Sequence, residues 1–451
     1  MEENNFNLQD TLTALVESKK YSALRDILTT MNPADIAAIF SYLAKEKLPL
    51  LFRLLPKELA AETFVEMDSD AQELLIRGFS DNELKEVVNE LYVDDAVDIV
   101  EEMPAGVVKR VLRQADPDMR KMINEILQYP EDSAGSIMTT EFVDLQPQMS
   151  VKEAMLHIRR TGVDKETIYT CYITDKNRKL IGMVSIRTLL LADEEDLLES
   201  IMETHVISVN TLEDQEMVAK ALGKYDFIAM PVVDREGRLV GIITVDDAID
   251  VLQEEVTEDI EKMAAITPSD KPYLKTSTIE IWQKRVPWLL ILMISATFTG
   301  IIITSFQDAL AAQVVLSAYI PMLMDTGGNS GSQSSVTIIR GISLGEIKFG
   351  DMPIVIWKEV RVAFLCGLTL AVSNFAKLML FDRVSLSVTL VVCITLVVTV
   401  LVAKVVGCAL PLLANQIGFD PAVMASPFLT TIVDAISLLI YFQTATFLLH
   451  L

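Results

Sequence analysis

One carboxylate in the sequence stands in the middle of a segment that is otherwise almost wholly apolar. Asp434 lies within residues 419–449, FDPAVMASPFLTTIVDAISLLIYFQTATFLL, and the hydroxyl groups of Thr430, Thr431 and Ser437 flank it. About 20 apolar residues suffice to cross a bilayer, and an ionised Asp at the centre costs roughly 2.5–3.5 kcal/mol on insertion scales. A protonated or internally hydrogen-bonded structural Asp is one interpretation. Ionisable residues inside membranes more often line ion or proton paths, so we predict that Asp434 faces a cation.

A second apolar segment carries a run of small and polar residues, PMLMDTGGNSGSQSS, at 321–335. Small residues that let helices pack closely would explain the run without any further function. Polar, glycine-rich backbone is tolerated at membrane depth only where protein or water satisfies it. We therefore expect this segment and Asp434 to form a polar lining for a hard cation. The small residues are Gly327, Gly328 and Gly331, and the oxygen donors are Asn329, Ser330, Ser332 and Gln333.

Acidic side chains are concentrated in two predicted helices outside these apolar segments. In VDDAVDIVEEM at 93–103, Asp94 and Asp98 are four residues apart, so they share a helix face and repel. In DDAIDVLQEEVTEDIEKMAAI at 246–266 the same spacing recurs in two rows, with Lys262 the only basic residue nearby. A solvated helix face is one interpretation of either segment. Bridging divalent cations would remove the repulsion, so we consider a cation-binding surface made by Asp94, Asp95, Asp98, Asp246, Asp247, Asp250, Glu254, Glu255, Glu258 and Asp259.

Residues 131–252 contain the same pattern twice. SIMTTEFVDLQPQMSVKEAM is echoed by SIMETHVISVNTLEDQEMVAK, and TCYITDKNRKLIGMVSIRTLLLA by AMPVVDREGRLVGIITVDDAIDVL. Each copy predicts a short strand, a helix, two strands around a polar turn, and another helix. The repeat resembles a pair of CBS domains.

CBS domains often bind adenine nucleotides, through a Gly-x-x-Ser/Thr-x-x-Asp run whose Asp holds the ribose. The second copy has the run complete as Gly241, Thr244 and Asp247, whereas the first has Ser185 but Thr188 in place of the Asp. The resemblance thus implies at most one good site for ATP, and a regulatory pair without nucleotide is an equally open interpretation. The residues expected at the site are Tyr172, Ser185, Phe227, Gly241, Thr244 and Asp247.

The charge of the 451-residue chain is distributed very unevenly. Of 63 acidic and 38 basic residues, eight and seven respectively follow Arg285, so residues 1–285 carry −24 of the formal net charge of −25. This excess argues against nucleic acid and anionic lipid as partners. The acidic start MEENNFNLQD has no basic region or short apolar core, so we predict no signal peptide. The four cysteines have no metal-ligand or redox spacing.

Five apolar spans follow, at about 286–306, 313–338, 353–380, 384–410 and 421–449. Basic residues precede the first span and surround the connection from the second to the third, which the positive-inside rule places in the cytoplasm. We therefore expect a multi-pass protein of the cell membrane with a cytoplasmic N-terminus and an outer C-terminus. Pro421 and Pro427 are expected to kink the fifth span.

Residues 1–130 predict short helices in units of about a dozen residues, each opened by a helix-start signal such as Asn32-Pro33, Pro56, Asp68 or Ser80-Asp81. Such hairpins pack naturally into a small superhelix. The fold class expected is therefore multidomain: an α-helical superhelical N-domain at 1–130, a tandem CBS (α+β) pair at 131–252, an acidic connecting helix and joint at 253–283, and an α-helical membrane domain with five transmembrane helices at 284–451.

Taken together, the acidic helical N-domain, the CBS pair, the acidic connecting helix and the motifs PMLMDTGGNSGSQ and FDPAVMASPFLTTIVDAISLLIYF resemble the MgtE family of magnesium channels over the whole chain. The resemblance implies a non-enzymatic homodimer with its pore on the two-fold axis. It implies that Asp434 binds hydrated Mg²⁺, that Asp420 lies near the cytoplasmic mouth, and that the connecting helix acts as a plug. Mg²⁺ dehydrates reluctantly and usually keeps several waters, which suits a site with few carboxylates.

The same resemblance implies closure by cytosolic Mg²⁺, which would bridge N-domain, CBS and plug carboxylates. It adds Glu216 and Asp226 to the sensor residues named above. A rival hypothesis is a membrane-anchored adenine-nucleotide sensor without transport. That hypothesis explains the CBS pair, but it leaves Asp434 and the TGGNSGSQ run without a role.

Overall fold

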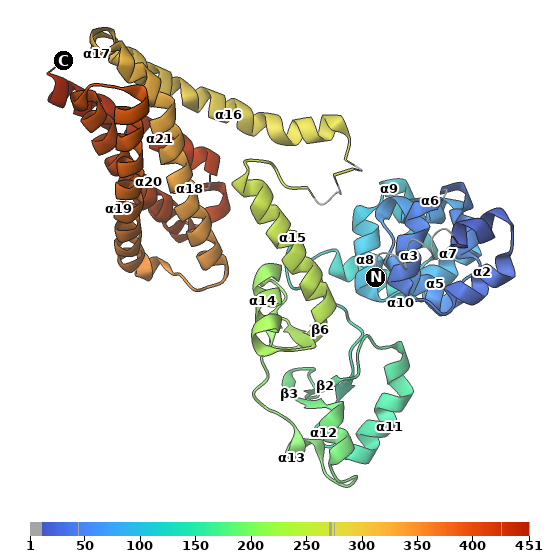
Figure 1. Ribbon diagram of the computed structural model, residues 1–451. Helices are drawn as coiled ribbons and strands as arrows, with labels where there is room; N and C mark the ends of the chain where they lie inside the picture. Colours follow the sequence, from blue (N-terminus) through green and yellow to red (C-terminus); the bar gives the residue numbers. More distant parts are fainter. Residues whose placement is uncertain (1–10, 44, 270–272, 275, 425, 451) are drawn as a thin grey trace. The chain divides into compact units, whose positions relative to one another are not determined.

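The computed structural model describes residues 11–43, 45–269, 273–274, 276–424 and 426–450. It divides into two compact units, Met1–Leu252 and Gln253–Leu451, each of which is described by itself (Figure 1). The opening segment MEENNFNLQD, for which we predict no signal peptide, lies outside the described residues, as does part of the joint that precedes the membrane domain.

Short helices make up the first part of the first unit, and the predicted start signals begin several of them. Asn32 and Asp68 each accept a hydrogen bond from a backbone N–H in the first helical turn, while Ser80 and Glu83 form a capping box. After the helical residues 11–17, the helices are α2 (Tyr21–Leu28), α3 (Pro33–Tyr42), η1 (Lys45–Lys47), α4 (Leu48–Phe52), α5 (Lys57–Val65), α6 (Ser69–Gly78), α7 (Asp81–Val88), α8 (Val93–Glu102), α9 (Ala105–Gln114) and α10 (Pro117–Ile126).

These helices stack so that elements two apart in the chain pack together. α3, α5, α7 and α9 follow one another in this way, and α4 packs on α6 and α8 on α10. Their apolar faces form one continuous core, in which the rings of Phe52, Phe64 and Phe79 contact one another. The stacking confirms the predicted superhelix of short helices.

Two small sheets with the same topology confirm the predicted repeat. In each, the first strand is parallel to the second and the second is antiparallel to the third, with a bulge at the same place in the last pair. The first copy contains β1 (Asp144–Leu145), α11 (Val151–Thr161), η2 (Gly162–Asp164), β2 (Thr170–Thr174), β3 (Leu180–Ser185), α12 (Ile186–Leu191) and α13 (Leu198–Ile201). The second contains β4 (Val209–Asn210), α14 (Gln215–Tyr225), β5 (Ala229–Val233), β6 (Leu239–Thr244) and the start of α15 (Val245–Met263).

The glycine on the third strand of each copy lies against the methionine of a Ser-Ile-Met sequence. A Cβ atom on Gly182 would lie 2.7 Å from Sδ of Met202, and one on Gly241 would lie 2.7 Å from Sδ of Met138. The segment preceding β1 pairs with the second sheet, and the segment preceding β4 pairs with the first. The two copies therefore exchange strand-like segments, and both glycines are needed where the exchanged segment crosses the sheet.

Long helices make up the second unit, and the predicted helical membrane domain is confirmed. Its elements are α16 (Thr278–Ser305), α17 (Gln307–Ala312), η3 (Val314–Tyr319), α18 (Ile320–Ser343), η4 (Phe349–Asp351), α19 (Met352–Lys377), η5 (Leu378–Asp382), α20 (Leu386–Gln416), η6 (Pro421–Met424) and α21 (Ser426–Leu449). Among the described residues, four segments are long and apolar enough to cross a membrane: those containing α16, α19, α20 and α21. α18, at 24 residues, contains the polar run of the second predicted span.

Several prolines stand at helix starts in this unit. The second span was predicted from residue 313, but α18 begins only at Ile320, because Pro321 stands in its first turn and η3 precedes it. The predicted kink of the fifth span is wrong. Pro421 opens η6 and Pro427 is the second residue of α21, positions at which proline breaks no intrahelical hydrogen bond.

α20 is the central helix of the second unit. It packs against α18, α19 and α21, while α16 packs against α21 (Figure 1). Apolar residues of α18, α20 and α21 form most of the core, which the stacked rings of Phe306 and Phe442 extend at a centroid distance of 4.8 Å. The polar run of α18 is thus held against both α20 and α21.

Candidate functional site

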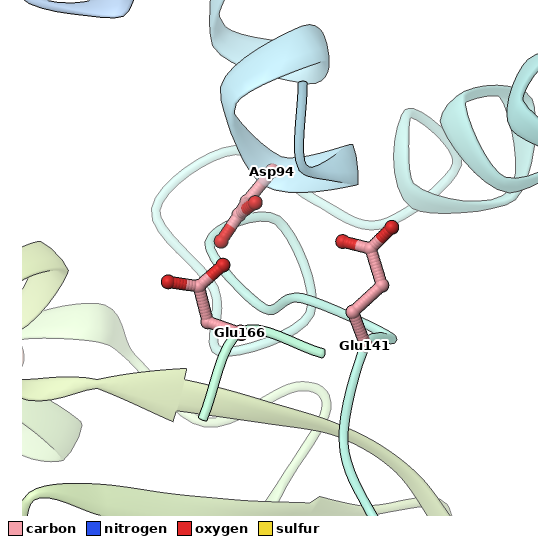
Figure 2. A group of neighbouring side chains, drawn as sticks. All are labelled: Asp94, Glu141 and Glu166. Carbon is pink, nitrogen blue, oxygen red and sulfur yellow. The ribbon is translucent and has the colours of Figure 1, made fainter. Parts of the chain in front are cut away.

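Three carboxylates from separate segments meet in the first unit (Figure 2). Asp94 lies in the first turn of α8, Glu141 precedes β1, and Glu166 precedes β2. One oxygen of each lies within 4.8 Å of one oxygen of the others. The helical part of this unit and the first CBS copy therefore share one acidic cluster.

Hydrogen bonds hold two of these three side chains in place. Glu141 accepts from the backbone N–H of Val93 at 3.1 Å and from the hydroxyl of Thr139 at 3.2 Å. Asp94 accepts from the N–H of Asp95. The Oε2 atom of Glu166 is buried and has no hydrogen-bond partner among the described residues. A buried carboxylate oxygen without a hydrogen-bond partner, in a residue grouped with two other carboxylates, suits a bound cation, because such an oxygen needs a positive ligand.

The negative charge of this cluster is poorly compensated. Burial, and then the charge of Asp247, raise the pKa of Asp94 well above its usual range. Burial, followed by the charges of Asp95 and Asp247, raises the pKa of Glu166 to about 8. Burial also raises the pKa of Glu141, against the lowering effects of its hydrogen bonds and of Lys165. A divalent ion bound here would stabilise the ionised form of these carboxyl groups, whose pKa values are raised in its absence.

Two further predicted sensor residues, Asp95 and Asp247, interact electrostatically with this cluster. Burial, then the charges of Asp247 and Glu141, raise the pKa of Asp95 to about 7. Burial, and the charge of Asp246 next to it, raise the pKa of Asp247 to about 6, against hydrogen bonds from Thr244. The charge of Asp247 therefore acts on Asp94, Asp95 and Asp98 alike.

Other residues predicted for the sensor are more exposed. Glu216 is paired with Lys220 on α14, and Asp226 is an exposed residue in the left-handed conformation at the end of that helix. The exposed side chains in this group are those of Asp98, Asp226, Asp246 and Asp250. For Asp98, partial burial of the carboxyl group, followed by the charges of Asp247 and Asp95, nevertheless raises the pKa to about 7. Among the described residues, none of these belongs to the group of three carboxylates formed by Asp94, Glu141 and Glu166.

Sequence reasoning missed Glu141 and Glu166. Each lies in a connecting segment of the first repeat, so neither helical nor strand periodicity marks it. Comparison of the repeats would have found them, because the equivalent positions of the second copy are His205 and Tyr225. The acidic pair is thus a feature of one copy only.

Some residues predicted to bind nucleotide form the expected local hydrogen bonds, whereas others have packing contacts. Asp247 accepts hydrogen bonds from the hydroxyl and the N–H of Thr244, and Ser185 and Thr188 form the corresponding bonds in the first copy. Gly241, however, lies so close to Met138 that this contact alone explains why the position is a glycine. Tyr172 is fully buried, with its hydroxyl donating to the carbonyl of Ala229 at 3.5 Å, while Phe227 is half-buried and stacks on Tyr225. Tyr172 therefore has a core position in this structure.

In the second unit, the end of α15 is joined to the loop before α21. Lys262 lies 2.7 Å from both Glu258 and Asp420, and Asp259 accepts from the hydroxyl of Ser343 at 3.5 Å. Burial lowers the pKa of Lys262, but the hydrogen bonds to Asp420 and Glu258 outweigh it and leave this pKa raised. The two predicted metal ligands Glu258 and Asp420 thus share a lysine. Glu254 and Glu255 lie one turn earlier on the same helix.

Asp434 lies on the side of α21 that meets the glycines of α18. A Cβ atom on Gly327 would lie 3.0 Å from Oγ of Ser437, and one on Gly328 would lie 2.9 Å from Cγ2 of Thr430. Asp434 is four residues after Thr430 and three before Ser437, so it shares their face of the helix. Asp434 therefore lies at the edge of a close helix approach, and its role in a polar lining for a cation stays a prediction.

A second carboxylate of this region was not singled out by sequence reasoning. Asp325, in the first half of α18, is exposed and acts electrostatically on Asp434. It belongs to the PMLMDTGG run, for which we predicted a role only for the small residues and the neutral oxygen donors. The membrane unit therefore presents two carboxylates, one from each of the helices that carry the polar motifs.

Comparisons with known proteins agree with this architecture along the chain. A family described as divalent cation transporters matches residues 320–444, the MgtE intracellular N domain matches 31–132, and CBS domains match 134–195 and 198–254. A magnesium transporter MgtE of Thermus thermophilus is 38% identical over 95% of each chain, and one of Bacillus subtilis is 31% identical over 97% of this chain and 96% of its own.

Solved structures match the soluble part. A crystal structure of the cytosolic domain of the Mg²⁺ channel MgtE in complex with ATP is 36% identical and has a TM-score of 0.52, covering 54% of this chain and 99% of its own. The soluble part of a magnesium transporter is 29% identical, with the same TM-score. The architecture and these relatives define a membrane transporter rather than an enzyme. The chain belongs to the MgtE family.

Proposed function

We propose that this protein moves Mg²⁺ across the cell membrane and that cytosolic Mg²⁺ closes it. The observation that carries the proposal is the glycine face of α18 against α21, with Asp434 at its edge, in a chain whose full-length relatives are magnesium transporters. The division of labour follows the expected domains, with sensing in residues 1–130 and 131–252, a plug and joint at 253–283, and transport in 284–451.

In the proposed transport site, Asp434 binds hydrated Mg²⁺ through its waters. Mg²⁺ requires near-octahedral oxygen ligands and gives up water reluctantly, so one carboxylate from each of two subunits suits it. This makes the functional protein a homodimer with the path at its two-fold axis. Asp325 adds negative potential on the same path, and Asp420 stands at the cytoplasmic mouth.

In the proposed sensor, Mg²⁺ binds at the Asp94, Glu141 and Glu166 cluster and at the carboxylates of the CBS pair and plug. The orphaned oxygen of Glu166 and the raised pKa values of Asp94 and Glu166 support a cation there. Without the ion the carboxylates repel, the soluble domains separate and the plug helix leaves the path. The further sensor residues are Asp95, Asp98, Glu216, Asp226, Asp246, Asp247, Asp250, Glu254, Glu255, Glu258 and Asp259.

ATP is the second proposed ligand, at the CBS pair. The complex of a related cytosolic domain with ATP supports this assignment. Asp247 would hold the ribose while it also faces the acidic cluster, so nucleotide and Mg²⁺ would be coupled through one side chain. The cytoplasmic N-terminus of a multi-pass membrane protein follows from a sensor that reads cytosolic Mg²⁺ and ATP.

The test is Mg²⁺ uptake by proteoliposomes that contain the purified full-length chain. Asp434→Asn keeps the shape of the side chain but removes its charge, and flux should fall to background while the protein stays folded. Asp308→Asn, at an exposed carboxylate of α17, is the matched control and should transport like wild type. Wild-type flux in a folded Asp434→Asn protein would remove Asp434 from the path. Wild-type protein that binds ATP but carries no Mg²⁺ would favour the nucleotide-sensor hypothesis.

A further inference from the structure

A lysine is buried among the transmembrane helices and has no role in the proposed transport or sensing sites. Lys404, on α20, is only 5% exposed. Its Nζ donates to the hydroxyl of Ser334 on α18 at 3.2 Å, and that hydroxyl donates to Oε2 of Glu359 on α19 at 2.6 Å. Nζ lies 3.9 Å from the same carboxylate oxygen. A buried Lys–Ser–Glu relay thus connects three helices.

Stability alone does not account for such a pair. Replacing a buried ion pair by apolar residues of similar volume is often neutral or stabilising, whereas removing one partner leaves an uncompensated charge. Inside a membrane, ionisable residues are rare and usually functional. The relay therefore serves to position the helices that it connects rather than to increase the stability of the bundle.

The relay lies one turn from a close backbone contact between α18 and α20. Gly331 is three residues before Ser334 on α18, and Gly407 is three residues after Lys404 on α20. A Cβ atom on Gly407 would overlap the carbonyl oxygen of Gly331. Residues three apart share a helix face, so the relay and this contact together fix the depth and rotation of α18 against α20.

The same rotation decides what α18 presents to α21. Gly327 and Gly328, on the preceding turns, meet Ser437 and Thr430 on either side of Asp434. We propose that Lys404 and Glu359, bridged by Ser334, hold α18 in the position at which its glycine face meets α21, which makes Lys404 a positioning residue for the cation path beside Asp434. This inference rests on the proposed transport function.

Four variants of the full-length chain test the relay. Lys404→Gln and Glu359→Gln each leave one charge unpaired, the double variant removes both charges, and Lys404→Arg keeps the cation. Lys377→Gln is the control, since Lys377 pairs with Asp382 at 3.4 Å on the exposed side of the same unit. The first readout is the initial rate of Mg²⁺ uptake per folded protein, measured against Mg²⁺ concentration.

Each single neutral variant should lose about tenfold in maximal rate per folded protein, and the double variant should recover to within about threefold of wild type, as coupled neighbours do. Lys404→Arg should stay within about threefold of wild type and Lys377→Gln should be unchanged. A purely structural pair would lower the yield of folded protein but not the rate per folded molecule. Unchanged rates in both single variants, or losses that simply multiply in the double variant, would overturn the proposal.

A second readout does not depend on transport. Cys408, one turn after Lys404, is buried beside Ile338 of α18. With Cys171, Cys366 and Cys393 replaced by Ala, alkylation of Cys408 by N-ethylmaleimide should be about tenfold faster in either single variant than in the double variant. If the wild type carries no Mg²⁺, the proposed function fails. Coupled alkylation rates would then still uphold the placement of α18, and equal rates in all variants would overturn it.

Discussion

The backbones of α18 and α20 touch at Gly331 and Gly407, where a Cβ atom on Gly407 would overlap the carbonyl oxygen of Gly331. No side chain separates the two helices there, so the run of small residues that a helix-packing interpretation would explain does pack helices. It also carries Gly327 and Gly328, which meet Ser437 and Thr430 of α21 on either side of Asp434 in the sequence. The packing and the cation-path interpretations of this run are therefore compatible.

The contact predicts a clear asymmetry between two glycine substitutions. Gly407→Ala should destabilise the protein by roughly 1–3 kcal/mol, because the added methyl forces the helices apart. Gly300→Ala, in α16 with no neighbouring atom within 4 Å, should be neutral or stabilising by up to about 1 kcal/mol. Thermal unfolding in detergent provides the measurement. Equal melting temperatures for the two variants would contradict the close approach.

The acidic cluster predicts that stability depends on pH in the absence of divalent ions. The pKa values of Asp95 and Glu166 are raised in the folded state to about 7 and about 8. Between their unfolded values, near 4, and these values, the folded protein holds more protons, so stability falls as pH rises through that window. Melting temperatures in EDTA should therefore decrease from pH 5 to pH 8.

Added Mg²⁺ should flatten this decrease, since the ion replaces the protons. Glu166→Gln should also flatten it in EDTA, whereas Asp144→Asn, at an exposed carboxylate of β1, should not. A slope that is the same in EDTA for wild type and Glu166→Gln would show that the cluster does not control it.

The nucleotide prediction concerns the difference between the two repeats. Asp247→Ala should weaken ATP binding at least about tenfold, the scale expected for loss of a hydrogen bond to a charged group. Ser185→Ala should have much less effect, because the first copy has Thr188 where the acidic residue would stand. Calorimetric titration of the full-length protein with ATP distinguishes them. Identical affinities for wild type and Asp247→Ala would remove the proposed ribose contact.

The sensor prediction concerns many weak sites acting together. Shifting a two-state equilibrium from 1:99 to 99:1 requires about 5.5 kcal/mol of differential binding, more than one weak site supplies. Asp95→Asn should therefore only raise the Mg²⁺ concentration needed for closure.

Neutralising Asp247, Asp250, Glu255 and Asp259 together should instead make protease protection nearly independent of Mg²⁺. Limited proteolysis of the full chain across a Mg²⁺ titration provides the comparison. A quadruple variant with wild-type protection at the wild-type midpoint would show that these carboxylates form only a solvated helix face.

Periodicity and repetition were sufficient to predict most of the fold. The start signals at Asn32, Asp68 and Ser80, and the echo between the two CBS copies, are local patterns that survive in the structure. The fifth span was placed correctly, but its prolines were misjudged, because proline in a first turn starts a helix and proline further inside kinks it. If Pro427 stood one turn further inside α21, it would remove an intrahelical hydrogen bond and kink the helix.

The candidate site was harder to predict, since its members meet only in three dimensions. Asp94 was found because it belongs to an acidic helix, whereas Glu141 and Glu166 stand alone in connecting segments. Lys404 and Glu359 are 45 residues apart on different helices, and nothing in either span signals that one hydroxyl joins them. Long-range pairing of single polar residues leaves no periodic signal.

The crossing of Met138 over Gly241 and of Met202 over Gly182 makes the two repeats unequally vulnerable to oxidants. Oxidation of a methionine to its sulfoxide adds a polar oxygen to the sulfur, and the glycines leave no space for that atom. Met138 is almost wholly buried, but Met202 is partly exposed. Peroxide would therefore damage the first repeat, the copy that contributes Glu141 and Glu166, before the second.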